Sequence, residues 1–160
     1  MSNCSSRNRP HIGVIGGSEC ATEVAQLAER VGAGIAERGG VLVCGGLAGV
    51  MEAACRGAKQ AGGTTIGILP GHERAAANEH VDIAIATGLG EARNLSIIRT
   101  ADRLIAIDGS HGTLSEIGFA LRVGKRVVGL QTWDIAGVIR AESPEQALDL
   151  AFEGLGQSPG

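Results

Sequence analysis

Short apolar segments alternate with helical segments along this chain, and glycines stand at most of the joints. The apolar segments are rich in Ile, Val, Leu and Ala, and the others carry apolar residues at helical spacing. This order predicts a parallel sheet joined by right-handed helical crossovers. The expected fold is an α/β, Rossmann-like three-layer domain with a mainly parallel sheet flanked by helices. Expected strands cover 11–15, 41–44, 64–69, 81–86, 103–107 and 126–130; expected helices cover 22–38, 49–61, 92–101 and 114–123, and a last helix opens with Ser143 as its N-cap.

The 160 residues suffice for one domain with its own core and are too few for two ordinary domains. We expect this domain to cover 10–154, with flexible polar tails at 1–9 and 155–160. The chain has 26 glycines but only two phenylalanines, one tryptophan and no tyrosine, so aliphatic side chains must build the core. Such a core is typical of a sheet that helices cover on both faces.

Charge and composition argue against several classes of function. The net charge is −3 and no basic stripe is present, so a nucleic-acid partner is not expected. The sequence shows no signal-peptide pattern and no apolar run of membrane-spanning length, so we expect a soluble, cytoplasmic protein without a membrane partner. Its four cysteines show no C-x-x-C pairing, Cys44 and Cys55 are expected in the core, and His72 and His80 are expected in a solvated loop. No metal site is predicted.

Glycine-rich turns follow four of the expected strands. They are 16–18 (Gly-Gly-Ser), 45–46 (Gly-Gly), 87–90 (Thr-Gly-Leu-Gly) and the turn that begins at Gly109. Because strand-to-helix turns of a parallel sheet meet at its carboxyl edge, these turns are expected to face one cleft. Neither a Walker A motif nor G-x-G-x-x-G is present, which disfavours ATP hydrolysis and NAD-dependent chemistry.

The segment 108–116 (Asp-Gly-Ser-His-Gly-Thr-Leu-Ser-Glu) carries the strongest indication of a ligand. A strand that breaks into glycines and restarts as a helix points several N–H groups into one volume at the positive end of the helix dipole, which is a typical phosphate site. Glu116 lies just inside the helix, where it has two interpretations. It is either a site carboxylate or the last residue of a capping box that begins at Thr113.

Arg93 stands near the start of its expected helix, where the dipole disfavours a positive charge. An anion in the cleft explains an arginine there better than helix stability does. Met51 follows the second glycine turn and is expected either in the core or in the wall of the cleft.

Three stretches, 41–55, 88–94 and 109–116, resemble the lysine-decarboxylase-like superfamily, which includes the Lonely Guy phosphoribohydrolases and the molybdenum-cofactor carriers. The resemblance covers about 11–130 and is strongest to the small carrier-like branch. It implies a catalytic role for Arg93 and Glu116 if the chain is an enzyme, and a phosphate loop at Gly109, Gly112 and Thr113.

The chain departs from the hydrolase pattern at three positions of the same motifs. Asn94 replaces a lysine, Asp108 replaces a proline and Ser110 replaces a glycine, which favours binding over hydrolysis. A pyridoxal-phosphate decarboxylase is not expected, because Lys59 and Lys125 are the only lysines and both lie on helix surfaces or ends.

The first hypothesis is a binding protein for a phosphorylated nucleotide-like or pterin-like molecule, similar to the molybdenum-cofactor carriers. The alternative is a nucleoside 5′-monophosphate phosphoribohydrolase, and a weaker third hypothesis is a nucleotide-sensing module. No cofactor is required for catalysis in these hypotheses; the molybdenum cofactor or a nucleotide would be the bound ligand. We also expect a homo-oligomer, a dimer or tetramer, with 117–123 at the contact. The candidate ligand-binding residues are Gly16, Gly17, Ser18, Gly45, Gly46, Met51, Arg93, Asn94, Gly109, Ser110, His111, Gly112, Thr113 and Glu116.

Overall fold

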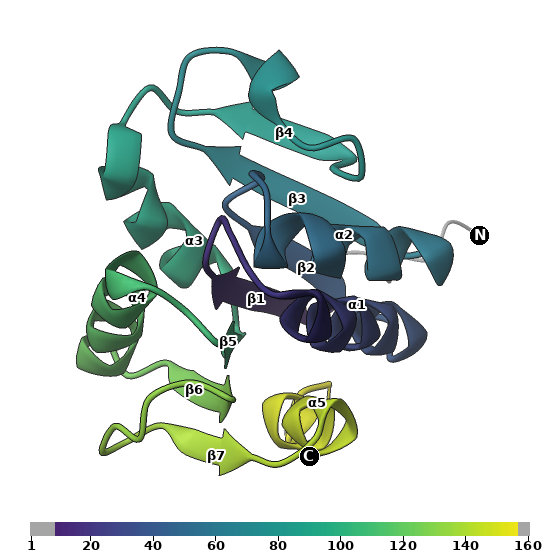
Figure 1. Cartoon of the computed structure of the whole chain (residues 1–160), viewed down its shortest axis with the longest axis vertical. Helices are drawn as coiled ribbons and strands as arrows, with labels where there is room; N and C mark the ends of the chain where they lie inside the picture. The colour runs from purple at the N-terminus through teal and green to yellow at the C-terminus, as the bar shows by residue number, and fades with distance from the viewer. Residues whose placement is uncertain (1–8, 157–160) are drawn as a thin grey trace.

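A seven-stranded sheet runs through the computed structural model, which describes residues 9–156, and helices cover both of its faces (Figure 1). The strands are β1 (His11–Gly16), β2 (Val41–Cys44), β3 (Thr64–Leu69), β4 (Ile83–Ala86), β5 (Arg103–Ile107), β6 (Arg126–Leu130) and β7 (Ile139–Ala141). The helices are α1 (Thr22–Glu37), α2 (Val50–Gln60), α3 (Asn94–Thr100), α4 (His111–Arg122) and α5 (Pro144–Phe152), with 3-10 turns η2 (Arg74–Ala76) and η3 (Gly90–Arg93).

The strand order is β4-β3-β2-β1-β5-β6-β7, and every neighbouring pair is parallel. The chain moves outward from β1 to β4 and then returns to pair β5 with the other side of β1. The order of strands therefore reverses between β1 and β5, which is where ligands bind in open α/β sheets. This architecture confirms the predicted Rossmann-like three-layer fold.

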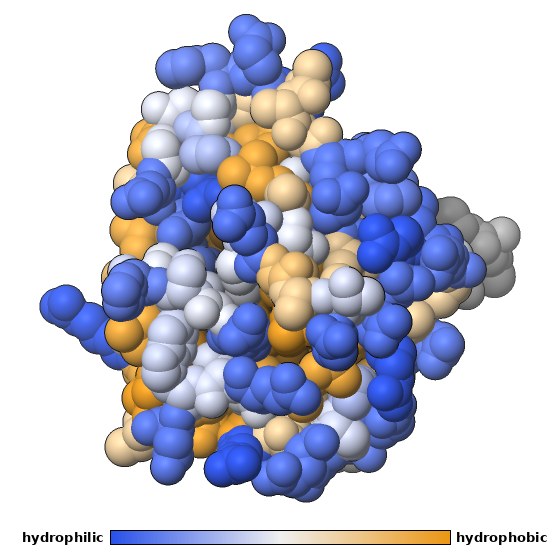
Figure 2. Space-filling model, in the orientation of Figure 1, coloured by the Kyte–Doolittle hydropathy of each residue, from blue (hydrophilic) through white to orange (hydrophobic). Residues whose placement is uncertain are grey.

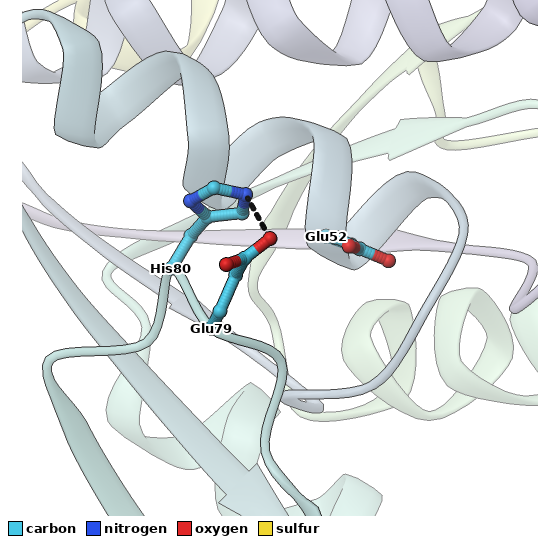
Figure 3. A group of neighbouring side chains, drawn as sticks. All are labelled: Glu52, Glu79 and His80. Carbon is cyan, nitrogen blue, oxygen red and sulfur yellow. Dashed lines mark ion pairs between the residues drawn. The ribbon is translucent and has the colours of Figure 1, made fainter.

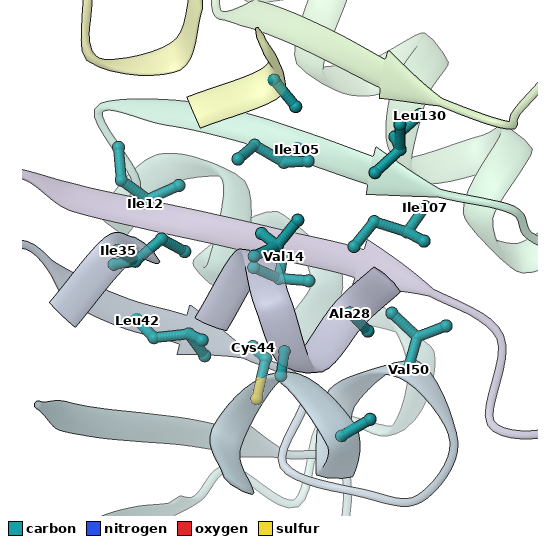
Figure 4. Close-up of a cluster of buried hydrophobic side chains, with 14 of the residues drawn as sticks. Ile12, Val14, Ala28, Ile35, Leu42, Cys44, Val50, Ile105, Ile107 and Leu130 are labelled. Atoms are coloured by element: carbon teal, nitrogen blue, oxygen red, sulfur yellow. The ribbon is translucent and has the colours of Figure 1, made fainter. Parts of the chain in front are cut away.

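The two helical layers use alternate side chains of the same strands. Helices α1, α2 and α5 pack on one face with Ile12 and Val14 of β1, as Figure 4 shows, and α3 and α4 pack on the other face with Ile15. Successive side chains of a strand point to opposite faces, so one apolar strand serves both layers. The fully buried residues are mainly Ala, Val, Ile and Leu, as the composition predicts.

Helices α1 and α2 approach so closely at Gly32 that a side chain would not fit there. A Cβ added at Gly32 of α1 would lie 1.8 Å from the carbonyl oxygen of Ala54 in α2. Glycine is thus required here by backbone contact rather than by its φ angle. The outer side of the two helices is polar (Figure 2), and the Arg56 guanidinium pairs there with Glu29 at 3.0 Å.

The structure corrects several predicted boundaries. Strand β7 was not predicted, because it has only three residues at the edge of the sheet. Strand β4 begins at Ile83 rather than at residue 81, and the expected helix 92–101 is a 3-10 turn followed by the short α3. Helix α4 begins at His111, three residues before the predicted start. The predicted N-cap of α5 is confirmed, since Ser143 Oγ accepts a hydrogen bond from the Gln146 N–H at 3.1 Å.

Most of the expected tails, residues 1–8 and 157–160, lie outside the described residues. Arg9, assigned to the first tail, is held on the domain because its guanidinium donates to the carbonyls of Gly39 (3.1 Å) and Gly40 (3.2 Å). Leu155, assigned to the second, donates its N–H to the Phe152 carbonyl at 2.9 Å. Within residues 9–156, no helix has the length and apolar character needed to cross a bilayer.

Candidate functional site

A cleft of about 530 Å³ opens at the carboxyl edge of the sheet, beside the point where the strand order reverses. Three segments line most of it: the turn after β1, the segment from η3 into α3, and the first two turns of α4. The lining residues are Gly16, Gly17, Ser18, Leu47, Met51, Pro70, Glu91, Ala92, Arg93, Asn94, Leu95, Ile98, Ser110, Gly112, Thr113, Ser115, Glu116 and Phe119.

Arg93 is the buried cation of this cleft, with 8% of its surface exposed. Its Nε donates to the Ile68 carbonyl at the end of β3 (3.0 Å), and its Nη1 donates to Asn94 Oδ1. Burial lowers the pKa of the guanidinium, and the negative charge of Glu116 opposes that effect. An arginine remains charged nonetheless, so a positive charge is fixed in the wall of the cleft.

Gly45 makes room for this arginine. A Cβ at Gly45 would lie 2.8 Å from Nη2 of Arg93 and 2.9 Å from the sulfur of Met51. The same residues line a small inner cavity of about 50 Å³, behind the cleft, that also contacts Glu116. The glycine after β2 is therefore needed for the position of the guanidinium.

Glu116 faces Arg93 from the second turn of α4 without forming an ion pair with it. Burial raises the pKa of this carboxyl group to about 7, and the nearby positive charge of Arg93 only partly offsets the shift. At neutral pH the group is thus divided between its acid and its carboxylate form. It can donate or accept a proton within the cleft.

The interpretation of Glu116 as a capping residue is wrong. Helix α4 begins at His111, so Ser110 is the N-cap and Glu116 lies too far into the helix to reach the first N–H groups. The Ser110 N–H donates instead to Thr113 Oγ1 at 3.3 Å. Capping therefore gives no account of the glutamate at this position.

The N-terminus of α4 brings Ser110, Gly112 and Thr113 to the cleft. Asp108, whose charge would repel an anion, does not line it. The Asp108 carboxylate instead lies close enough to Cys20 to add to the effect of burial and raise the pKa of that thiol. The Asp108 carboxylate is thus not part of the wall of the cleft.

Ten of the fourteen predicted binding residues line the cleft, and Gly45 lines the inner cavity. Gly46, Gly109 and His111 line neither. Gly46 and Gly109 have positive φ angles of 76° and 134° and shape their turns, which is a role that only glycine fills easily. In the turn at 87–90 the glycines do not reach the cleft, and the residues that follow them line it instead.

Sequence reasoning missed eight lining residues, most of them apolar neighbours of the predicted polar ones. Leu95 and Ile98 follow Arg93 in α3, and Phe119 stands three residues after Glu116 in α4. Helical spacing from Glu116 would have found Phe119, whereas Leu95 and Ile98 do not stand at helical spacing from Arg93. The missed residues are Leu47, Pro70, Glu91, Ala92, Leu95, Ile98, Ser115 and Phe119.

A second group of ligand-type side chains, Glu52, Glu79 and His80, gathers between α2 and the segment before β4 (Figure 3). One ligand atom from each lies within 4.8 Å of the other two, although no metal-binding spacing links them in the sequence. His80 Nε2 lies 3.7 Å from Glu79 Oε1, and Glu79 is largely exposed. None of the three lines the cleft.

Known proteins resemble this chain in sequence and in fold. A family model described as the SLOG cluster4 family matches residues 9–153. The molybdenum cofactor binding protein of Rippkaea orientalis has a TM-score of 0.85 and 41% identity, covering 89% of this chain and 94% of its own. The molybdenum cofactor carrier protein of Chlamydomonas reinhardtii has a TM-score of 0.85 and 36% identity, covering 93% and 99%. A cytokinin riboside 5′-monophosphate phosphoribohydrolase of Mycobacterium marinum is 31% identical, over 78% of this chain and 72% of that protein.

Proposed function

This chain belongs to the SLOG cluster4 family, and we propose that its cleft holds a phosphorylated small molecule of the pterin or nucleotide class. The Lonely Guy-like resemblance of the sequence is confirmed by that membership. The similarity to molybdenum-cofactor carriers supports the molybdenum cofactor as the ligand. In this proposal the protein holds its ligand without converting it.

The observation that carries the proposal is the fixed charge of Arg93 beside the start of α4. A phosphate in the cleft would accept hydrogen bonds from the N–H groups around Gly112 and from the hydroxyl of Ser110, and would be neutralised by Arg93. The remaining walls, with Leu95, Ile98 and Phe119, suit a flat apolar ring. A volume of about 530 Å³ falls within the range of small-molecule sites.

Native mass spectrometry of the purified protein tests this proposal. We expect a bound mass that is released on denaturation and, for a pterin, yields a fluorescent product on oxidation. Arg93→Ala should reduce the bound fraction at least tenfold, because a charge-assisted contact to phosphate is lost. Gly118→Ala is the matched control, since a Cβ there meets no atom within 4 Å. A wild-type protein without bound ligand, and without affinity for added nucleoside monophosphates, would refute the proposal.

Glu116 favours a second candidate function, the hydrolysis of a nucleoside 5′-monophosphate to a free base and ribose 5-phosphate. A carboxyl group with a pKa of about 7 can protonate a leaving base or, as its carboxylate, stabilise the oxocarbenium-like charge on the ribose carbon. Asn94 stands where the hydrolase pattern carries a lysine, which is why binding is our first proposal.

Incubation with AMP, GMP and CMP, followed by chromatography of the free bases, separates the two functions. Turnover in the wild type that Glu116→Gln lowers by about 100-fold or more would establish the enzyme. Bound ligand without release of any base would support the carrier.

We further propose that the protein is a dimer or tetramer. Leu95 beside the cleft and Leu114 of α4 are exposed, as are Ile83 and Ile85 of the edge strand β4. In this proposal these exposed apolar side chains contribute to the contact between subunits. Light scattering coupled to size exclusion should give a mass of at least twice 16.2 kDa, and a monomer at micromolar concentration would contradict the proposal.

A further inference from the structure

Three side chains of the kinds that bind metal ions converge outside the cleft. Glu52 stands in the first turn of α2, and Glu79 and His80 lie in the segment before β4 (Figure 3). One ligand atom of each lies within 4.8 Å of the other two. Strand β3 separates the two stretches in the sequence, so only the fold brings the three side chains together.

The spacing of these atoms is close to what one metal ion requires. Zn²⁺ forms bonds of about 2 Å to nitrogen and oxygen in a tetrahedral arrangement, so two of its ligand atoms lie roughly 3.3 Å apart. Atoms that already lie within 4.8 Å of one another need to approach by at most about 1.5 Å. Rotations about the side-chain bonds of the two glutamates can supply a movement of this size.

The donor atoms select among metals. Mg²⁺ and Ca²⁺ take oxygen ligands, whereas the imidazole of His80 offers nitrogen, which suits transition metals. Catalytic zinc sites use three nitrogen, sulfur or carboxylate ligands and leave a further position for water. One imidazole and two carboxylates match that number and those donor types.

The two carboxylates of the group lie close together without a lysine or arginine to offset their charge. The two cations of α2 pair with other carboxylates: Arg56 with Glu29 at 3.0 Å and Lys59 with Asp82 at 2.8 Å. Among residues 9–156, Glu52 forms no ion pair, and Glu79 forms one only with His80. Like charges at this separation repel, and a divalent cation between them would replace the repulsion with attraction.

Hydrogen bonds outside the group fix the backbone that carries Glu79 and His80. The Asn78 side chain donates from Nδ2 to the Leu47 carbonyl at 2.8 Å. The His80 carbonyl accepts from Oγ1 of Thr65, a fully buried residue of β3, at 2.6 Å. Two of the three ligands therefore start from a fixed backbone, which reduces the loss of conformational freedom when a metal binds.

Solvent reaches the group from outside. Glu52 lines a surface hollow of about 360 Å³, and the side chains of Glu79 and His80 are 81% and 23% exposed. A hydrated ion can therefore approach, exchange some of its waters for protein ligands and keep others.

We propose that Glu52, Glu79 and His80 bind one divalent transition-metal ion, and that Zn²⁺ is the metal their donor atoms suit best. Water completes the coordination, and the ion ties the segment before β4 to the first turn of α2. None of the three residues lines the cleft, so the site stands independently of the function proposed there.

Calorimetric titration of the metal-free protein with Zn²⁺ tests the site. We expect one ion per chain. His80→Asn and Glu52→Gln should each lower the affinity about tenfold or more, because each removes one metal ligand. An excess of Mg²⁺ should not displace the Zn²⁺, since Mg²⁺ takes oxygen rather than imidazole nitrogen.

Matched substitutions outside the group separate it from other metal-binding side chains. His72→Asn removes a histidine from the same connection between β3 and β4, and Glu73→Gln removes a glutamate from it. Both variants should bind Zn²⁺ as the wild type does. Cys4→Ser combined with Cys20→Ser should also bind it equally well, because thiols are not part of the site.

Thermal unfolding shows whether the variants fold and whether the metal binds the folded chain. The backbone hydrogen bonds of residue 80 remain in His80→Asn, so without metal this variant should unfold close to the wild type. At equal concentration, Zn²⁺ should raise the unfolding midpoint of the wild type and of His72→Asn more than that of His80→Asn.

The proposal is overturned if the wild type binds no Zn²⁺, or if His80→Asn binds it as tightly as the wild type. Displacement of the Zn²⁺ by Mg²⁺ would overturn it too, because the group would then act only as a pair of carboxylates. So would a loss of binding when the thiols of Cys4 and Cys20 are replaced.

Discussion

On the face of the sheet covered by α1, α2 and α5, charged side chains pair across helices, whereas the face covered by α3 and α4 keeps two charged groups apart beside a cleft. Arg56 pairs with Glu29 and Arg38 pairs with Asp149 in the first layer. In the second, Arg93 is bonded to a carbonyl and to Asn94, and Glu116 shares no direct ion pair with it.

The two layers also differ in how closely their helices pack. Helices α1 and α2 meet through backbone contact at Gly32, while α3 has only seven residues and stands at the rim of a cavity. A layer packed this closely stabilises the fold, and a layer that leaves space and unpaired charge provides for a ligand at some expense of stability. Substitutions in the first layer should therefore change folding, and substitutions in the second should change binding, with a change in stability where a buried charge is removed.

Gly32→Ala should have the largest effect on the free energy of unfolding. The new Cβ would lie 1.8 Å from the Ala54 carbonyl oxygen, so α1 and α2 must move apart. We expect the free energy of unfolding to fall by about 3 kcal/mol or more, which is the upper end of the usual cost of overpacking. The cost is high because the obstacle is a backbone carbonyl, which cannot rotate away. Urea unfolding followed by circular dichroism measures it. Gly118→Ala of α4, the control, should be neutral or slightly stabilising, as alanine favours a helix.

Glu116→Gln should change how stability depends on pH. The pKa of Glu116 is about 7 in the folded chain and 4.5 is its ordinary value, so the folded state holds this proton more tightly than the unfolded state does. The wild type therefore loses stability as pH rises from about 4.5 to 7, and the loss remains above pH 7.

Glutamine removes this dependence, and the variant should be more stable than the wild type at pH 8, by on the order of 2 to 3 kcal/mol. At pH 4 the two should differ little. Unfolding midpoints measured across pH 4–8 test the expectation, and curves that stay parallel over this range would contradict it.

Gly45→Ala should weaken binding far more than folding. The new Cβ would lie 2.8 Å from Nη2 of Arg93 and would push the guanidinium aside. The end of a side chain can move in this way, whereas backbone cannot. We expect about a tenfold loss of bound ligand, equivalent to about 1.4 kcal/mol, with a smaller change in unfolding. Native mass spectrometry gives the bound fraction. A variant that keeps its ligand would show that Arg93 is not positioned by this glycine.

The alternation of apolar and helical segments predicted most of this fold, because the inner strands are buried on both faces and appear in the sequence as short continuous apolar runs. It failed at β7, where three residues with an exposed Arg140 offer no pattern. It also misplaced the start of α4, since His111 and Gly112 are weak helix formers that the Ser110 cap and the tertiary structure hold in the first turn.

The polar part of the cleft could be predicted because glycines and charges mark it in the sequence. Arg93 and Glu116 stand out by residue type, and Gly45 by its place after a strand. Leu47, Pro70 and Phe119 are ordinary apolar residues, and only the tertiary fold brings them to the cleft. The roles of Gly46 and Gly109 depend on backbone angles, which residue type alone does not separate from ligand contact.

Ser143→Ala, a substitution in the layer of α1, α2 and α5, should have the smallest effect on the free energy of unfolding. Ser143 Oγ accepts from the Gln146 N–H at 3.1 Å, and Gln146 Oε1 accepts from the Glu142 N–H at 2.7 Å, so two N–H groups near the start of α5 are satisfied reciprocally. Loss of the hydroxyl should lower the free energy of unfolding by about 1 kcal/mol. Ser143→Asp, which keeps an acceptor at the N-cap, should unfold close to the wild type.

Bound ligand, measured as before, should be unchanged in both variants, because α5 lies on the face of the sheet opposite α3 and α4. If Ser143→Asp were as unstable as Ser143→Ala, capping would not explain the loss. If either lost its ligand, the two layers would be coupled through the sheet. Gly45→Ala should do the reverse of Ser143→Ala, because it should lose ligand while retaining most of its stability. Only this opposite behaviour of the two substitutions would show that one layer serves stability and the other serves binding.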